Sequence, residues 1–341
     1  MKKLLVEGNR GTSTIWVGET MDRLESFITP ERTVVLTDTT VYGLYRKQFP
    51  DCPVIQIGTG EKIKTLDTAA TIFERLVAVE ADRSSFILGV GGGIVCDIAG
   101  FVASTYMRGV PFGFVSTTLL SQVDASVGGK NGVNFGGFKN MVGVFNQPEF
   151  VICDLSMLKT LPEKEILCGF AEIIKHGAIA DGKMLDFIEE NRDPAMALAD
   201  AVIGHLVLRS VEIKADVVSR DEREQGERRK LNFGHTFGHA IEKLTGIPHG
   251  EAVGMGMVLA ARLSVEKGLL SAADADRLEQ LVRRCGLPVK APLEAPSMLE
   301  TMRKDKKREG GRIHFVFLEA LGRARVEKIT LDELSRLTDK L

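Results

Sequence analysis

The feature that most restricts the fold of this chain is the alternation of short β-branched runs with helical stretches in its first half. Strands are predicted at residues 13–17, 33–36, 54–57 and 85–89, each rich in apolar or β-branched side chains. Between the last two, residues 65–79 place apolar side chains on one face of a helix. Alternating β and α elements predict a parallel sheet that carries helices on its faces.

The second half of the chain has a different character. From about residue 162 to residue 302 the strand signals disappear and helical patterns dominate. Pro162 is typical of the first turn of a helix. Longer helices are predicted at residues 195–218, 252–267 and 272–284.

Two further strands are predicted near the end of the sequence, at residues 313–318 and 324–329 around a turn at Gly322. The whole pattern predicts two domains. Residues 1–160 form an α/β N-terminal domain with a parallel, Rossmann-like sheet, and residues 161–341 form a mostly α-helical C-terminal domain. Clefts between such domains are common places for small-molecule sites, and we expect the active site there.

The composition is ordinary for a globular protein and excludes some partners. The 341 residues are 44% hydrophobic and 26% charged, which is sufficient for a substantial core. The net charge of -2 gives no overall basic field, so nucleic acid is not an expected partner. The sequence begins with a segment that turns polar too early for a signal peptide, and no apolar run approaches the length of a membrane span, so we expect no membrane association.

The cysteines indicate a reducing compartment. There are five, an odd number, and none is part of a CxxC pair. They are interpreted as buried free thiols and not as a disulfide framework. We therefore expect a cytoplasmic protein.

A glycine-rich turn follows the strand predicted at residues 85–89. Gly91, Gly92 and Gly93 stand between this strand and a predicted helix that contains Asp97. Glycines let backbone N–H groups approach an anion closely, and a helix N-terminus adds partial positive charge, which suits a pyrophosphate. On the glycine count alone, a tight turn without a ligand is an equally good interpretation. The spacing differs from GxGxxG, so this is not an ordinary Rossmann signature.

Charged residues follow two of the other predicted strands. Asp38 stands where a ribose-binding carboxylate commonly lies. Glu61 and Lys64 follow another strand. Each of these charges, taken alone, is more often a solvated loop residue.

Two small, polar stretches lie in the middle of the chain, at residues 116–130 and 134–140. Such compositions make a poor core, and we expect them to be loops. They supply Lys130 and Lys139 and lie close in sequence to Asp124. The alternatives are plain surface loops or loops around a phosphate-bearing ligand. Glycines stand just before both lysines, and this pattern favours a phosphate-bearing ligand.

Three of the six histidines fall within fifteen residues. His235 and His239 are four residues apart and share a face of a predicted helix, and His249 follows ten residues later. Glu172 and Lys175 share one face of an otherwise apolar helix, where a charged pair needs a partner. This pattern favours a metal or acid–base site, but it does not tell which two histidines bind the metal.

Several motifs together resemble the 3-dehydroquinate synthase family of sugar phosphate cyclases. They are Gly91-Gly92-Gly93 with Asp97, residues 100–109, Thr117-Thr118-Leu119-Leu120, Val127-Gly128-Gly129-Lys130, residues 158–162, Ala171-Glu172-Ile173-Ile174-Lys175, residues 231–242, residues 249–253 and Asp305-Lys306-Lys307. The matches run in order from about residue 34 to residue 318, and jointly they are highly specific.

The resemblance implies four sets of site residues. NAD would lie at Asp38, Glu61, Lys64, Gly91, Gly92, Gly93, Asp97, Thr117, Thr118, Lys130, Lys139, Met157, Leu158, Lys159 and Thr160. A divalent metal, zinc or cobalt, would be held by Glu172, His235 and His249. Arg108, Asp124, Lys130, Asn140, Lys175 and His239 would be catalytic, and Lys214, Arg228, Asn232 and Lys306 would bind the substrate.

The resemblance also implies the reaction, a step of the shikimate pathway to aromatic amino acids. The family converts 3-deoxy-D-arabino-heptulosonate 7-phosphate to 3-dehydroquinate and phosphate, as a carbon–oxygen lyase. It does so by transient oxidation with NAD, phosphate elimination, reduction and intramolecular aldol closure. The family arginine that matches Arg108 reaches a neighbouring subunit, so a homodimer is implied.

The sequence departs from the family pattern at Cys96, Ser116 and Asn131, and its loop at residues 135–138 is similar to that of sister cyclases. Three alternatives therefore remain: a sister sugar phosphate cyclase, a metal-dependent polyol dehydrogenase, or a non-catalytic binding module. Lys214, Arg228 and Asn232 suit a substrate carboxylate and favour the synthase over the sister cyclases.

Overall fold

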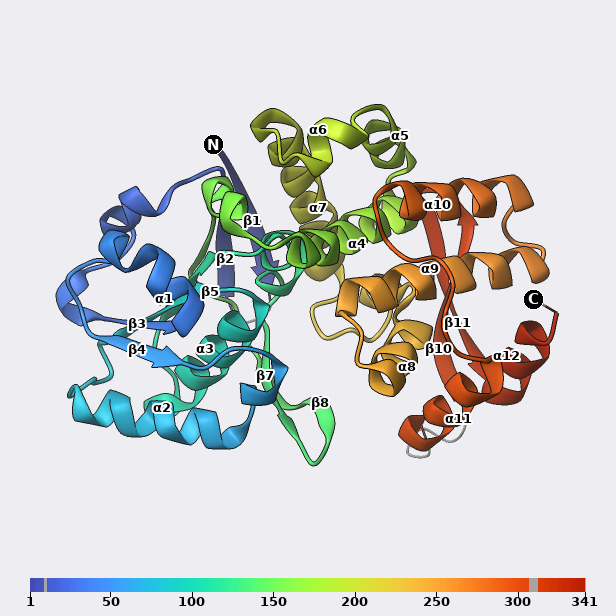
Figure 1. Ribbon diagram of the computed structural model, residues 1–341. Helices are drawn as coiled ribbons and strands as arrows, with labels where there is room; N and C mark the ends of the chain where they lie inside the picture. Colours follow the sequence, from blue (N-terminus) through green and yellow to red (C-terminus); the bar gives the residue numbers. More distant parts are fainter. Residues whose placement is uncertain (9–10, 307–311, 341) are drawn as a thin grey trace. The chain divides into compact units, whose positions relative to one another are not determined.

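The computed structural model describes residues 1–8, 11–306 and 312–340. The chain forms two compact units (Figure 1). The first comprises Met1–Leu161 and Ile203–Glu222, and the second comprises Pro162–Val202 and Arg223–Leu341. A segment from the C-terminal half thus packs with the first unit, which a division at residue 160 does not include.

The first unit is built on a seven-stranded sheet with the strand order β1-β2-β9-β6-β5-β3-β4. All neighbouring strands are parallel except the β1–β2 pair. The strands are β1 (Lys2–Gly8), β2 (Gly11–Val17), β3 (Thr33–Asp38), β4 (Val54–Ile57), β5 (Phe86–Gly91), β6 (Phe112–Ser116) and β9 (Phe150–Cys153).

The order of the parallel strands creates a switch point between β3 and β5. After β3 the chain adds β4 on one side, and it then adds β5, β6 and β9 in turn on the other. In open α/β sheets, ligands bind outside the carboxyl ends of the strands where the order reverses in this way. The topology therefore marks the ends of β3 and β5 as the ligand-binding edge.

Helices connect these strands and cover the sheet: α1 (Thr39–Tyr45), α2 (Leu66–Ala78) and α3 (Gly93–Thr105). Helix α3 packs closely on β5. A Cβ atom added at Gly89 would lie only 2.9 Å from the Cβ of Ala99. A buried cluster that includes Leu88, Val115 and Ile152 fills the core beneath the sheet.

The stretch at residues 134–140, which was expected to be a loop, lies in a β-hairpin, so that prediction was wrong. Strand β7 (Lys130–Phe135) pairs with β8 (Phe138–Phe145) through a two-residue turn. Gly136 and Gly137 have φ angles of 59° and 78°, which suit the tight turns that match the twist of a hairpin. Small polar residues here serve a ladder and a turn instead of irregular loops.

Helix α7 (Asp200–Arg220) and the two residues after it join the first unit through buried polar contacts. Lys214 donates to the carbonyl of Asp124 at 2.6 Å and pairs with its carboxylate. Gln147 donates to Glu222 at 3.0 Å. These contacts attach a helix from the second half of the sequence to the β-sheet unit.

Among its described residues, the second unit is helical apart from one hairpin, β10 (Arg312–Ala320) with β11 (Arg323–Thr330). Its helices are α4 (Glu163–Ala180), α5 (Gly182–Glu190), α6 (Arg192–Met196), α8 (His235–Thr245), α9 (His249–Glu266), α10 (Ala272–Arg284), α11 (Ala295–Lys306) and α12 (Leu331–Thr338). The helix expected at residues 195–218 is interrupted between α6 and α7, where Leu198 has a φ of 54°.

Glycines bring α8 and α9 unusually close together. A Cβ atom at Gly256 would lie 2.0 Å from the carbonyl oxygen of Gly234, and one at Gly238 would lie 3.2 Å from the carbonyl oxygen of Ala252. Gly234, which precedes α8, also has a φ of 79°, a left-handed conformation that favours glycine. The backbones can therefore approach, and the histidines that begin the two helices come together.

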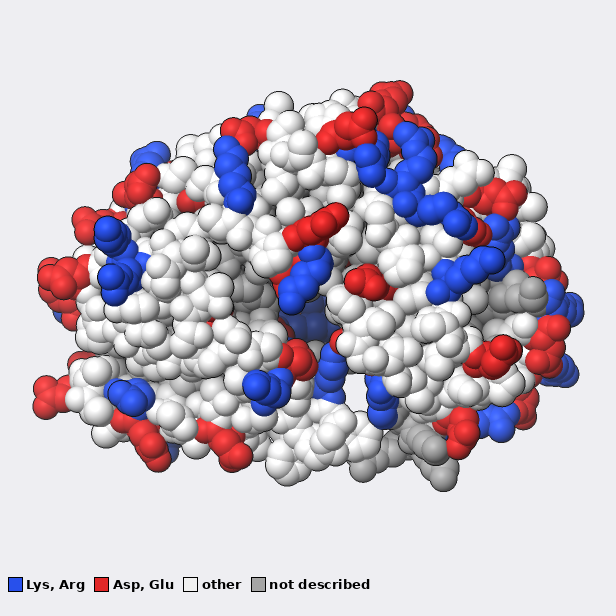
Figure 2. Space-filling model, in the orientation of Figure 1, with Lys and Arg blue, Asp and Glu red and all other residues white. Residues whose placement is uncertain are grey.

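The predicted fold class, an α/β unit with a parallel sheet and a mostly helical unit, is confirmed. None of the described helices is long and apolar enough to cross a membrane. Acidic and basic side chains are interspersed over the outer parts of the face shown in Figure 2, consistent with the net charge of -2.

Candidate functional site

The glycine-rich turn connects β5 to α3 at the switch point of the sheet. A Cβ atom at Gly92 would lie 2.9 Å from the Thr118 side chain, and one at Gly93 would lie 2.9 Å from the Cβ of Ala125. A Cβ at Gly91 would lie 2.5 Å from Val95. No larger residue fits this turn without movement, so the backbone N–H groups at the start of α3 stay accessible to an anion.

The end of β6 lies directly beside this turn. The amide of Thr117 donates to the carbonyl of Gly91 at 3.0 Å, and Ser121 ties down Thr118 through a 2.9 Å bond to its carbonyl. The predicted cofactor residues Gly91, Gly92, Thr117 and Thr118 therefore occupy one place in the first unit.

Asp38 ends β3, across the switch point from the glycines. Its Oδ1 atom accepts hydrogen bonds from the amides of Thr40 and Val41 at 2.8 and 2.9 Å, which caps α1. The cap fixes the orientation of the carboxylate at the carboxyl end of the strand, where a ribose hydroxyl is bound in dinucleotide folds.

Four of the predicted polar residues form one network beside the turn. Lys64, which is 4% exposed, donates to both Asp97 on α3 and Asn140 on β8. Glu61 accepts from Asn134 at 2.8 Å. Burial raises the pKa of Asp97, and the positive charge of Lys64 opposes that shift.

The other predicted cofactor residues lie in three elements of the same unit. Lys130 begins β7 and Lys139 lies in β8, both with exposed side chains. Met157 and Leu158 are buried in a short helix of residues Leu155–Thr160. Thr160 approaches the Tyr45 hydroxyl at 2.6 Å, while Lys159 is exposed.

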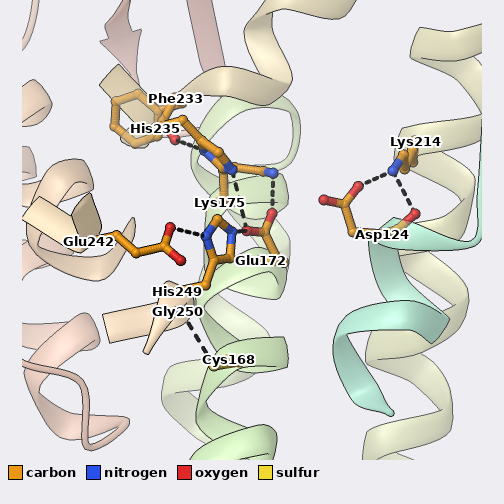
Figure 3. A network of polar contacts seen from close by, with 10 residues as sticks. All are labelled: Asp124, Cys168, Glu172, Lys175, Lys214, Phe233, His235, Glu242, His249 and Gly250. Atoms are coloured by element: carbon orange, nitrogen blue, oxygen red, sulfur yellow. Dashed lines mark hydrogen bonds and ion pairs between the residues drawn. The ribbon is translucent and has the colours of Figure 1, made fainter. Parts of the chain in front are cut away.

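The second unit contains a compact carboxylate–histidine centre (Figure 3). The Oε1 atom of Glu172, on α4, lies 3.7 Å from Nε2 of His235 and 3.6 Å from Nε2 of His249. One ligand atom from each of the three residues lies within 4.8 Å of the others. Glu172 is fully buried. A carboxylate and two imidazoles are the donors of a catalytic divalent-metal site, so the residues present fit such an ion.

Each member of this centre is held by a second polar contact. His235 Nδ1 lies 3.2 Å from the carbonyl of Phe233, and His249 Nδ1 lies 3.2 Å from Glu242 (Figure 3). Lys175, 1% exposed, pairs with the other oxygen of Glu172. Such contacts fix the ring orientation and direct both Nε2 atoms toward the carboxylate.

The backbone that carries His249 is anchored to α4. The amide of Gly250 donates to the Cys168 sulfur at 3.4 Å, and a Cβ atom at Gly250 would lie 2.3 Å from the Cα of Cys168. Cys168 lies one helical turn before Glu172. The start of α9 and the Glu172 turn of α4 are therefore packed against each other.

The pKa values of the two histidines are shifted in opposite directions. Burial, with the positive charge of Lys175, holds the pKa of His235 well below its ordinary value. Burial also lowers the pKa of His249, but hydrogen bonds to Glu172 and Glu242 outweigh it and raise that pKa to about 9.

His239 does not belong to this three-residue group. Its ring lies 5.2 Å from that of His235 and 6.1 Å from that of His249, and its side chain is exposed. The geometry thus separates the three histidines, which their spacing in the sequence could not.

The remaining predicted residues lie in three settings. Lys214 and Asp124 pair with each other in the first unit. In the second unit, Arg228 is 2% exposed and Asn232 donates to Glu224. Arg108 is an exposed residue with a left-handed φ of 72°. Lys306 ends α11, and its side chain lies outside the described part of the chain.

Two residues in these networks were not among the predicted site residues. Glu242 lies within the histidine block but was not assigned a role, and Asn134 was seen only as part of a loop. Glu242 is seven residues before His249, and the two side chains meet only because α8 packs against α9. The glycine turn of the first unit and the carboxylate–histidine centre of the second are together typical of enzymes that combine a dinucleotide cofactor with a divalent metal.

This chain belongs to the 3-dehydroquinate synthase family. Residues 54–168 match the family model described as 3-dehydroquinate synthase N-terminal, and residues 169–308 match the one described as 3-dehydroquinate synthase C-terminal. A 3-dehydroquinate synthase of Geobacter sp. (strain M21) is 45% identical over 309 residues, which cover 87% of this chain and 85% of that protein. The family predicted from the sequence motifs is confirmed.

Solved structures of sister cyclases share the fold along the whole chain. A 2-deoxy-scyllo-inosose synthase complexed with carbaglucose-6-phosphate, NAD+ and Co2+ is 25% identical with a TM-score of 0.88, covering 99% of this chain and 100% of that one. A 2-epi-5-epi-valiolone synthase from Streptomyces hygroscopicus subsp. jinggangensis 5008 with NAD+ and Zn2+ bound is 26% identical with a TM-score of 0.86, covering 100% of both chains.

Proposed function

We propose that this chain is a 3-dehydroquinate synthase, which converts 3-deoxy-D-arabino-heptulosonate 7-phosphate to 3-dehydroquinate and phosphate in the shikimate pathway. One observation carries the proposal: a buried Glu172 faces His235 and His249 in a chain that is 45% identical to a 3-dehydroquinate synthase. The reaction class is that of a carbon–oxygen lyase.

NAD fits the first unit. The glycine turn offers backbone amides for a pyrophosphate, and Asp38 stands across the switch point in the place of a ribose ligand. NAD supplies a hydride acceptor and donor, so the substrate can be oxidised and later reduced without net change in the cofactor. Lys64, Asp97 and Glu61 belong to the polar network beside the glycine turn, and they would hold the nicotinamide half or its ribose.

A divalent metal, zinc or cobalt, fits the second unit. Glu172, His235 and His249 would hold it, with Glu242 and the Phe233 carbonyl keeping the two rings in place. The metal supplies a Lewis acid that lowers the pKa of a hydroxyl and polarises a carbonyl.

The side chains of this protein would bind and orient an anionic substrate. Lys175 lies beside the carboxylate–histidine centre with its charge buried. It can hold a substrate oxygen there while it neutralises the negative charge of Glu172. Lys130, Asn140 and Arg108 would contact the leaving phosphate, and His239 and Asp124 complete the proposed catalytic set. Much of the catalysis would come from positioning and electrostatic stabilisation.

The substrate carboxylate distinguishes this reaction from those of the sister cyclases. Arg228 is 2% exposed, so it is not a solvated surface charge, and a guanidinium grips a carboxylate through two parallel hydrogen bonds. Lys214, Asn232 and Lys306 would complete the substrate site. The 45% identity to a 3-dehydroquinate synthase, against 25% and 26% to the two sister cyclases, supports the same choice.

We further propose a cytoplasmic homodimer. All five cysteines are free thiols, four of them buried, as a reducing compartment would keep them. Arg108 would reach toward the neighbouring subunit, as implied for the family arginine that it matches. Its left-handed backbone conformation is uncommon for a side-chain-bearing residue and is often associated with function.

A substrate comparison tests the proposed function. Purified protein with NAD and zinc or cobalt would be given heptulosonate phosphate or glucose 6-phosphate, and phosphate release and the carbocyclic product would be measured. We expect turnover with the carboxylate-bearing heptulosonate phosphate only. Preference for glucose 6-phosphate would identify a sister cyclase, and accumulation of NADH would identify a dehydrogenase.

Arg228→Ala sharpens that comparison. Loss of a charged hydrogen-bond partner costs about 1.5–3 kcal/mol, or roughly tenfold to a hundredfold in kcat/KM for heptulosonate phosphate. NAD affinity should stay unchanged. Arg223→Ala, which removes an exposed arginine five residues earlier, is the matched control. A wild-type kcat/KM in the Arg228 variant would remove this residue from the substrate site.

A further inference from the structure

We propose that Asn134 is a positioning residue that holds the Glu61 carboxylate on the cofactor side and the Asn140 backbone on the substrate side. The inference rests on the proposed function, which assigns Glu61 to NAD and Asn140 to the substrate. All three residues belong to the first unit. Asn134 therefore links two binding sites through one side chain.

The backbone of Asn134 leaves the ladder of the hairpin in which it lies. In the β7–β8 pair, Val133 faces Val142 and Phe135 faces Phe138, with a register irregularity between them. The amide of Asn134 instead donates to the carbonyl of Lys64 at 2.8 Å, and the residue forms an isolated bridge with Thr65. Bulges of this kind redirect a side chain and occur beside active sites.

The side chain of Asn134 uses both ends of its amide. Its Nδ2 atom donates to Oε1 of Glu61 at 2.8 Å, and its Oδ1 atom accepts from the backbone amide of Asn140 at 2.9 Å. Only an amide side chain of this length supplies a donor and a carbonyl-type acceptor in these two directions. An aspartate would keep the acceptor, lose the donor and place a second negative charge beside Glu61.

Asn140 needs this support because its backbone is unusual. Its φ angle is 51°, in the left-handed region that side-chain-bearing residues rarely occupy. The bond from its amide to Asn134 and the bond from Lys64 to its Oδ1 atom hold this conformation from two sides. Lys64 also pairs with Asp97, so the same network extends to the helix that follows the glycine turn.

Two substitutions separate the two contacts of Asn134. Asn134→Asp should raise the Kd of NAD about tenfold, because a charge-assisted bond to Glu61 is replaced by repulsion, while KM for heptulosonate phosphate stays within twofold at saturating NAD. Asn134→Ala should raise both the Kd of NAD and that KM, since both contacts are lost. Asn191→Asp makes the same chemical change at a half-buried asparagine of the second unit, and it should alter neither.

A double-mutant cycle decides whether Asn134 acts through Glu61. Titration calorimetry would give the Kd of NAD for the wild type, Asn134→Asp, Glu61→Ala and the double variant, with thermal unfolding to confirm that each is folded. We expect the tenfold effect of Asn134→Asp to disappear in the Glu61→Ala background. An unchanged Kd in Asn134→Asp, or equal effects in both backgrounds, would overturn the inference. A wild-type protein that binds no NAD would instead overturn the proposed function.

Discussion

The glycine turn of the first unit and the carboxylate–histidine centre of the second are built in opposite ways. At the turn, the binding groups are backbone N–H groups, and Gly91, Gly92 and Gly93 keep side chains away from them. At the centre, the side chains of Glu172 and the histidines carry the site, and each is oriented by a second polar partner.

This difference determines which substitutions each region can accept. The turn is limited by space, so a single added methyl group should disturb it even without any change of charge. The centre is limited by charge and orientation, so a substitution that preserves shape but removes a charge should disturb it most.

Glu172→Gln should nearly abolish metal binding and turnover. The substitution keeps the size of the side chain but removes the negative charge that faces both histidines and Lys175. Loss of a group that only hydrogen-bonds to a metal ligand costs about 10–100-fold in metal affinity. Loss of a ligand itself should therefore cost at least about a hundredfold. Metal content after dialysis measures the effect. Glu165→Gln, on the same helix and half-buried, is the control, and equal metal content in both variants would contradict the assignment.

Gly92→Ala should weaken NAD binding roughly tenfold to a hundredfold. The new Cβ atom would lie 2.9 Å from the Thr118 side chain, and overpacking of this kind costs about 1–3 kcal/mol. Metal content should stay at the wild-type level. In the control Gly43→Ala, the Cβ atom meets no atom within 4 Å, and this helical substitution should raise stability by about 0.5–1 kcal/mol. Calorimetric titration with NAD would refute the steric account if the two variants bound equally well.

Glu242→Gln should lower metal affinity about tenfold. The carboxylate lies 3.2 Å from Nδ1 of His249, and its neutral replacement weakens the bond that orients the ring. The effect stays at the lower end of the range because both side chains are partly exposed. Competition with a chelator of known affinity measures it, and NAD affinity serves as the internal control. Unaltered metal affinity would show that His249 is oriented by other contacts.

Cys168→Ala should change metal affinity only a few-fold. The sulfur accepts one hydrogen bond from the Gly250 amide at 3.4 Å, and sulfur is a weak acceptor. Cys96→Ala is the counterpart beside the glycine turn, where the buried thiol should have no effect on metal binding. The same chelator competition applies, and a hundredfold loss in the Cys168 variant would mean that packing, not charge, limits the centre.

The residues of the carboxylate–histidine centre are prominent in the sequence because the pattern that marks them is local. Glu172 and Lys175 lie on one face of an apolar helix, and the clustering of His235, His239 and His249 is evident from their spacing. The sequence could not separate His239 from the other two, because that distinction depends on how glycines pack α8 against α9.

The first unit was harder to predict where its contacts are long-range. Strands β6 and β9 were not expected as strands, because each is a short, wholly buried run without an alternating pattern. The hairpin of β7 and β8 was taken for loops because its residues are small and polar. Asn134 gave no signal, since its importance arises from contacts with Glu61, 73 positions away.

Under the proposed function, NAD is needed for turnover but is not consumed. The most direct measurement follows phosphate release and NADH absorbance together, with metal-loaded protein, heptulosonate phosphate and NAD far below the substrate concentration. We expect many phosphates released per NAD, no accumulation of NADH and no release without NAD. One NADH formed for each substrate consumed, or full turnover in protein freed of NAD, would contradict it.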